Sequence, residues 1–176
     1  MPTARPEPGT FVPYFTNYIS RVPEGTEPLA MLRQQPAELR QLIGGLSEEQ
    51  ALTRYAPGKW TIKEMLLHIV DTERIFSYRA LRIARGDQQP LPGFDENAYA
   101  DASGANERTL SDLLAEYEAV RQATVALFQS FPPAVLDRPG TASNNPLTVR
   151  ALLFVAPGHE AHHLYILRER YLPLLG

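Results

Sequence analysis

The chain has 176 residues, of which 44% are hydrophobic and 21% charged, and its formal net charge is -3. This length and balance are typical of one soluble globular domain, and no basic stretch indicates a nucleic-acid partner. Because the chain has no cysteine, disulfides, thiolate metal ligands and a cysteine nucleophile are excluded. A site for a transition metal must therefore use histidine, supported by carboxylate or water.

The N-terminal residues 1–8 do not resemble a secretory signal, because they are rich in proline and lack an apolar run. No apolar stretch in the chain approaches the roughly 18 residues that a membrane-spanning helix needs. We therefore expect a cytoplasmic protein without a membrane partner.

Residues 1–27 carry five prolines and are predicted to form an irregular arm packed on the rest of the chain. Apolar and aromatic residues are expected to hold this arm in place: Phe11, Tyr14, Phe15, Tyr18 and Ile19. The same aromatic residues would suit a contact with a second copy, so a homodimer is also predicted. Residues 28–176 are assigned to one helical bundle domain.

Apolar residues that recur at the helical period predict four long helices. The first runs over residues 28–44, where Pro36 should kink or split it. The second, over residues 60–85, is the clearest, because it contains no proline or glycine. Thr61 and Glu64 are positioned to form a capping box at its start.

A long polar connection over residues 86–108 leads to the third helix, predicted over residues 110–131. The fourth is predicted over residues 148–171, and Pro157 should interrupt it and kink it just before His159. We find no alternating strand pattern and no internal repeat. The sequence therefore predicts an all-α fold, a four-helix bundle with at least one long crossover.

Three of the four histidines fall within residues 159–163. On a helix, His159 and His163 lie one turn apart on the same face, which is the spacing that two-histidine metal sites use. The fourth, His68, lies among apolar residues on the inner side of the second helix. Together they predict a metal held by three histidines between two helices, with a coordination position left open.

Other interpretations of these histidines stay open. A lone histidine among apolar residues, such as His68, is most often a hydrogen-bonded core residue, and a histidine pair near a helix end is often solvated. The last segment also matches the zinc-protease pattern H-E-x-x-H, with Glu160 as the base. That alternative is disfavoured, because the longer protease pattern has Gly and His where this chain has Ile166 and Glu169.

Three neutral imidazoles leave the charge of a metal uncompensated. Such a site would lower the pKa of a bound water or polarise a substrate oxygen or thiolate. Zn²⁺ is the default metal for these ligands, and Ni²⁺ is also suitable. The candidate catalytic groups, which would orient or deprotonate the nucleophile, are Asp71, Glu160 and His162. A thiol would have to come from outside, since the chain has no cysteine.

Five segments together resemble the signature of the DinB-like family: Arg54–Glu64, His68–Arg74, Phe76–Asp87, Pro92–Tyr99 and Gly158–His163. The resemblance extends over nearly the whole chain, and the segment around Trp60 adds specificity to the short histidine motif. It implies a four-helix bundle with up-down-down-up topology. It also implies a metal held by one histidine of the second helix and two of the fourth, here His68, His159 and His163.

The resemblance also implies several activities. Some DinB-like proteins are S-transferases or isomerases that use thiols such as bacillithiol or mycothiol, others are described as metal-dependent hydrolases, and many have no known activity; members are often homodimers. We therefore expect a metal-dependent enzyme that activates water or an external thiol against a small electrophilic substrate. The alternative is a non-catalytic metal- or small-ligand-binding protein of a stress response, which a carboxylate such as Glu64 closing the site would favour.

Overall fold

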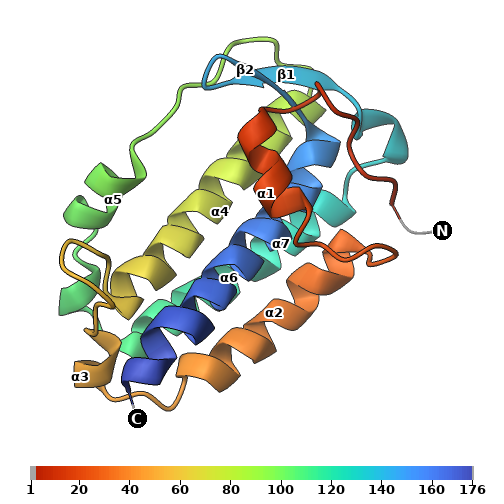
Figure 1. Ribbon diagram of the computed structural model, residues 1–176. Coiled ribbons are helices and arrows are strands. Elements are labelled where there is room, and N and C mark those ends of the chain that lie inside the picture. Colours follow the sequence, from red (N-terminus) through yellow and green to blue (C-terminus); the bar gives the residue numbers. More distant parts are fainter. Residues whose placement is uncertain (1–2, 176) are drawn as a thin grey trace.

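The computed structural model describes residues 3–175, in which four long helices pack as a bundle (Figure 1). The long helices are α2 (Pro28–Ile43), α4 (Ile62–Ala84), α6 (Leu110–Gln129) and α7 (Val149–Ile166), which a π-helical turn (Leu167–Tyr171) and a 3-10 turn (Leu172–Leu174) prolong. The shorter elements are α1 (Thr16–Ile19), α3 (Glu48–Ala51), α5 (Glu96–Ala102), β1 (Pro139–Ala142), β2 (Asn145–Thr148) and three 3-10 turns (Pro13–Phe15, Ala105–Glu107 and Pro133–Val135). The predicted all-α four-helix bundle is confirmed. Residues 1–2 of the predicted arm and residue 176 of the predicted bundle lie outside the described residues.

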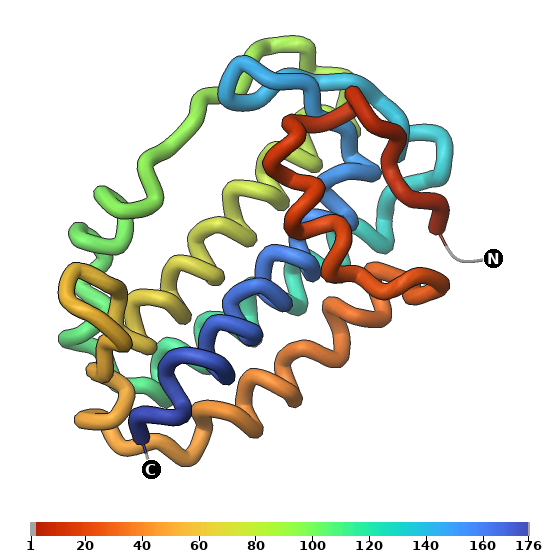
Figure 2. The backbone as a smooth tube through the Cα atoms, in the orientation of Figure 1, coloured from red at the N-terminus to blue at the C-terminus, as the bar shows by residue number. Residues whose placement is uncertain are grey.

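The helices α2 and α4 each contact both α6 and α7, so they occupy opposite corners of the bundle. In Figure 1, α4 and α6 run in one direction and α2 and α7 in the other. Because α4 and α6 are parallel and consecutive, the chain between them must return along the length of the bundle, and it does so on the outside (Figure 2). This arrangement is the up-down-down-up order with a long crossover. Within residues 3–175, no helix is long and apolar enough to cross a membrane.

Helix α4 begins at the predicted capping box. The hydroxyl of Thr61 accepts the backbone N–H of Glu64 at 3.0 Å, and the carboxylate of Glu64 accepts the backbone N–H of Thr61 at 2.7 Å. The breaks predicted at Pro36 and Pro157 are not observed, because α2 and α7 continue through both prolines. Burial of the surrounding apolar side chains outweighs the hydrogen bond that each proline removes.

A short β-hairpin was not predicted, and it covers the end of the bundle where α4 ends and α7 begins (Figure 1). β1 and β2 are antiparallel, and Ser143 and Asn144 form the tight turn between them with φ of 51° and 59°. This backbone is that of a two-residue hairpin turn of the primed type. Strands of four residues, each with a proline, are too short to produce an alternating pattern in the sequence.

The N-terminal arm lies across α7 of its own chain (Figures 1 and 2). Its backbone approaches α7 at Gly158, where a Cβ atom would stand only 2.1 Å from the carbonyl oxygen of Tyr18. Only glycine can occupy such a position. The aromatic residues Phe11 and Tyr18 are buried in the core of this chain, so the predicted homodimer gains no support from them and stays a prediction.

One charged cluster lies inside the bundle. Arg121 of α6 is only 2% exposed, and it donates to both carboxylate oxygens of Glu73 in α4, to Glu160 in α7 and to Gln35 in α2. The hydroxyl of Tyr117 donates to the other oxygen of Glu160 at 2.6 Å. These five residues, here called the Arg121 cluster, connect all four long helices.

Replacing Gly158 with alanine should loosen the arm. The added methyl group would overlap the carbonyl of Tyr18, and overpacking of this kind costs about 1–3 kcal/mol. We expect urea unfolding to show this loss and trypsin to cleave faster after Arg21. Gly45→Ala is the matched control, because a methyl group there would meet no atom within 4 Å. Equal stability of the two variants would contradict the close contact.

Replacing Arg121 with methionine should cost much more than removing an exposed ion pair. Glu73 and Glu160 would stay buried without a cation, at a cost of about 3–5 kcal/mol. The control Arg40→Met breaks an exposed pair with Glu118 and should cost less than about 1 kcal/mol. Chemical denaturation measures both changes, and similar losses would refute a structural role of the Arg121 cluster.

The loss caused by Arg121→Met should depend on pH. Burial raises the pKa of Glu160 above its ordinary value, although Arg121 and Tyr117 oppose this. A carboxyl group with a raised pKa in the folded state destabilises the fold above that pKa, and the cost disappears as the pH falls towards the unfolded-state pKa. Removing the cation raises the pKa further, so the loss should be smaller at about pH 5 than at about pH 8. A loss independent of pH would argue against buried, charged carboxylates.

Candidate metal site

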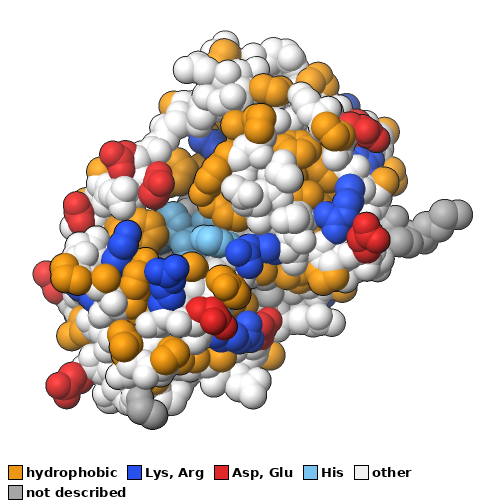
Figure 3. Space-filling view, in the orientation of Figure 1, with side chains coloured by type: hydrophobic (Ala, Val, Ile, Leu, Met, Phe, Trp, Pro, Cys, Tyr) orange, Lys and Arg blue, Asp and Glu red, His pale blue; other side chains and the backbone are white. Residues whose placement is uncertain are grey.

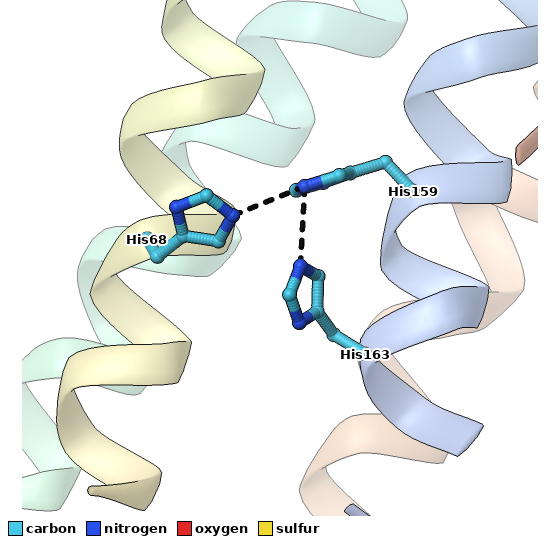
Figure 4. A group of neighbouring side chains, drawn as sticks. All are labelled: His68, His159 and His163. Carbon is cyan, nitrogen blue, oxygen red and sulfur yellow. Dashed lines mark hydrogen bonds between the residues drawn. The ribbon is translucent and has the colours of Figure 1, made fainter. Parts of the chain in front are cut away.

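Three histidines from two helices meet at one point (Figure 4). His68 comes from α4, and His159 and His163 lie one turn apart on α7. The Nε2 atom of His159 is 3.1 Å from that of His68 and 3.2 Å from that of His163. One ligand nitrogen from each residue lies within 4.8 Å of the other two. We call these residues the histidine triad.

The separations within the triad suit a shared metal ion better than hydrogen bonds. Two nitrogens that bind one tetrahedral metal at about 2.0–2.1 Å lie about 3.3 Å apart. A neutral imidazole nitrogen carries either one proton to donate or one lone pair to accept a hydrogen bond. The Nε2 atom of His159 faces two other nitrogens, so hydrogen bonds satisfy only one of its contacts. A cation among the three nitrogens would satisfy all of them.

Burial keeps the triad in the neutral form that binds metals. Desolvation lowers the pKa of His68 to about 4. Desolvation, together with the neighbouring histidines, lowers the pKa of His159 and of His163 well below the ordinary value. Each ring can therefore present a lone pair at neutral pH without first losing a proton.

Aromatic side chains hold the triad from two sides. The ring centre of Trp60 lies 4.5 Å from that of His68 and 6.5 Å from that of His163, to which it is nearly parallel. Tyr18 of the arm meets His159 edge-on, with a centre-to-centre distance of 5.2 Å. These contacts restrict rotation of the imidazoles, which favours a preorganised site.

The triad lines a cavity of about 390 Å³. Helices α4 and α7 contribute its histidine side, and the opposite walls come from Phe15 of the arm, Phe94 of the crossover and Leu147 of the hairpin. Figure 3 shows histidine atoms in a hollow, which both hydrophobic and Lys or Arg side chains border. A small molecule entering the cavity would therefore reach the triad directly.

Among residues 3–175, no carboxylate joins the three histidines. Glu64, which would have closed the site, instead accepts hydrogen bonds from the backbone of Thr61, from Arg54 at 2.8 Å and from Asn106 at 2.7 Å. These bonds hold its carboxylate at the start of α4. A further coordination position of a metal in the triad would therefore face the cavity.

The structure separates the three candidate catalytic groups. His162 lines the cavity beside the triad. Glu160 is 1% exposed and bound in the Arg121 cluster, because a residue next to His159 points about 100° away from it around the helix. Asp71 lies 3.3 Å from Arg74 in an ion pair and is not part of the cavity lining. These positions do not support proton transfer at the triad by Glu160 or Asp71, and a catalytic role of either residue stays a prediction.

Two features of the site escaped the sequence prediction. Tyr18 was expected only to anchor the arm, yet it lies against the triad and lines the cavity. Arg79 of α4 also lines the cavity. The spacing of His68, Thr72 and Arg79 places them on one face of α4, so the helical period contained a signal for this residue.

The comparisons with known proteins agree with the fold. The profile of the DinB superfamily matches residues 31–167. A protein of Geobacillus thermodenitrificans is 26% identical, over 85% of this chain and 87% of its own. A protein of Bacillus licheniformis is 31% identical, over 76% of this chain and 77% of its own. Both carry the name "Putative metal-dependent hydrolase".

A solved structure has the same fold. YfiT from Bacillus subtilis, described as "a probable metal-dependent hydrolase with an unusual four-helix bundle topology", superimposes with a TM-score of 0.71. The superposition covers 82% of this chain and 87% of YfiT, at 19% sequence identity. The profile match covers most of the chain, and a relative is more than 30% identical over three quarters of it. The chain therefore belongs to the DinB superfamily.

Proposed function

We propose that this protein is a metal-dependent hydrolase of small electrophilic substrates, with one divalent transition metal, zinc or nickel, bound to the Nε2 atoms of His68, His159 and His163. The observation that carries this proposal is the convergence of three neutral imidazole nitrogens, 3.1 and 3.2 Å apart, beside an accessible cavity. The names of the two relatives support the same class of activity. A closing carboxylate, which would favour the non-catalytic alternative, does not join the triad within residues 3–175.

A bound metal would act as a Lewis acid on a substrate oxygen and would lower the pKa of a nucleophile in its open position. The protein's own residues would contribute orientation and proton transfer. Phe15, Phe76 and Leu147 form an apolar wall that excludes bulk water from part of the cavity. His162 is the one candidate catalytic residue in the lining, so we assign proton transfer to it.

A second observation favours thiol S-transfer as the alternative reaction. A smaller cavity of about 240 Å³ shares Trp60, His162 and His163 with the first. Two cavities that share His163 of the triad would allow two reactants to approach a metal bound there. Transfer of a group to an external thiol such as bacillithiol needs such an arrangement, whereas hydrolysis needs access for one organic substrate and water.

Substituting each member of the triad with alanine should abolish tight metal binding. Loss of a ligand should weaken affinity by more than the 10–100-fold typical of changes to the hydrogen-bond partners of ligands. Elemental analysis after dialysis against zinc measures the bound metal. His162→Ala is the matched control and should keep about one equivalent, because its ring lies outside the triad. Full retention of metal by all three triad variants would remove the proposal.

A screen of activated esters and epoxides, each with and without low-molecular-weight thiols, should separate the two reactions. We expect ester hydrolysis that requires the metal and proceeds without thiol. Removal of the metal should reduce the rate to that of the triad variants, measured by chromophore release. Strict dependence on a thiol would exclude simple hydrolysis and support S-transfer instead.

A further inference from the structure

Arg79 is a buried cation without an acidic partner. Its side chain is 5% exposed, and its Nη2 atom donates to the carbonyl of Pro92 at 2.8 Å and to the hydroxyl of Ser143 at 3.3 Å. Both acceptors are uncharged. Within residues 3–175 Arg79 forms no ion pair, and burial lowers its pKa with no nearby carboxylate to oppose the change.

Two other arginines of the bundle, in contrast to Arg79, have carboxylate partners. Arg121 is as deeply buried but binds two carboxylates, and Arg82, one turn further along α4, pairs with Asp87. A buried charge is costly unless it is paired. A guanidinium has five N–H groups, and the hydrogen bonds of Arg79 in the described chain use only those of Nη2. Its Nε and Nη1 atoms are therefore left to bind something else.

The cavity connects Arg79 to the triad, because Arg79 and His68 both line it. Thr72 and Phe76 lie between them along the same face of α4. Eleven residues of helix rise about 16 Å, and a helical side chain leans back towards the N-terminus, which brings the guanidinium of Arg79 closer to His68. A single extended molecule would therefore contact both ends.

The character of the cavity changes along this path. By the positions along α4, His68 of the triad lies towards one end, Phe76 with the ring of Phe15 packed against it lies between, and Arg79 lies towards the other end. The acidic residue in the lining, Glu96, is exposed and makes no ion pair with Arg79 among the described residues. The cavity thus offers a site for a negative charge that the protein itself does not fill.

We propose that Arg79 binds the carboxylate or phosphate group of a substrate whose reacting end lies at the triad. The planar guanidinium fork matches both anions, and the apolar middle suits an aliphatic or aromatic linker. The substrate class is therefore an electrophile with an anionic tail. This inference rests on the proposed function for the identity of the reacting end, but the anion site itself does not require a metal.

The first experiment tests the anion site alone. Octanoate, octyl phosphate and the neutral methyl octanoate are titrated calorimetrically into the purified protein. We expect at least one anion to bind about tenfold or more tightly than the ester, which is the scale of a charge-assisted hydrogen-bonded pair. The anion that binds more tightly shows whether the site prefers a carboxylate or a phosphate group. Equal binding of all three compounds would overturn the proposal.

Variants assign the preference to Arg79. In Arg79→Gln the anion-to-ester affinity ratio should fall to about one. Arg82→Gln is the matched control on the same helix, outside the cavity, and should keep the ratio. Arg79→Lys keeps the positive charge but lacks the planar guanidinium, so it should retain part of the preference for the anion. It replaces Arg79→Gln if the glutamine variant does not fold. If the anion-to-ester affinity ratio is unchanged in both Arg79 variants, Arg79 has only a structural role, in which it connects the crossover to the hairpin.

The second experiment connects the anion site to the triad. Monohydroxamates of straight-chain dicarboxylic acids, from the succinic to the sebacic member, are compared with their methyl esters on zinc-loaded protein, because the hydroxamate binds the metal. We expect one chain length at which the acid binds about tenfold more tightly than the ester. If none of the hydroxamate methyl esters binds, the proposal of a metal in the triad fails. The first experiment then still tests the anion site at Arg79. If the esters bind but no acid is preferred, Arg79 does not serve a ligand held at the triad.

Discussion

The geometry of the histidine triad depends on the buried ion pairs of Arg121. It binds Glu73 of α4 and Glu160 of α7, and a slip of either helix would leave a buried charge unpaired. Glu160 directly follows His159 in the sequence, and Glu73 lies little more than one turn beyond His68. The ion pairs that align α4 with α7 therefore also align the two sides of the triad. Glu160, a candidate catalytic base, is thus held by Arg121 and Tyr117 next to the triad.

Arg121 and Arg79 are both buried, but they differ in their partners. The Arg121 cluster satisfies its charges internally and links all four long helices. Among the described residues Arg79 uses only Nη2 in hydrogen bonds, which leaves its Nε and Nη1 groups without a protein acceptor and open to a ligand in the cavity. Buried polar groups left unsatisfied by the protein mark ligand sites more clearly than the overall shape does.

The bundle supplies the triad, while segments outside the four helices shape the cavity. The arm, the crossover and the hairpin provide most of the apolar walls, and close packing at Gly158 keeps the arm against α7. Because one fold supports many functions through its loops, substrate choice within this superfamily should vary with these segments more than with the helices. The substrate class proposed here follows from Arg79 together with such walls.

The long helices, the capping box of Thr61 and the one-turn spacing of His159 and His163 could be predicted from the sequence alone, because helical period and capping act between residues a turn apart. His68 followed as the one histidine outside residues 159–163. Tertiary structure decided which groups meet across the bundle. It turned Glu160 towards Arg121, laid the arm on its own α7 and placed the unpaired Arg79 beside the triad. These outcomes depend on how separate helices pack. The helical period within one segment does not specify which other helix its apolar face contacts.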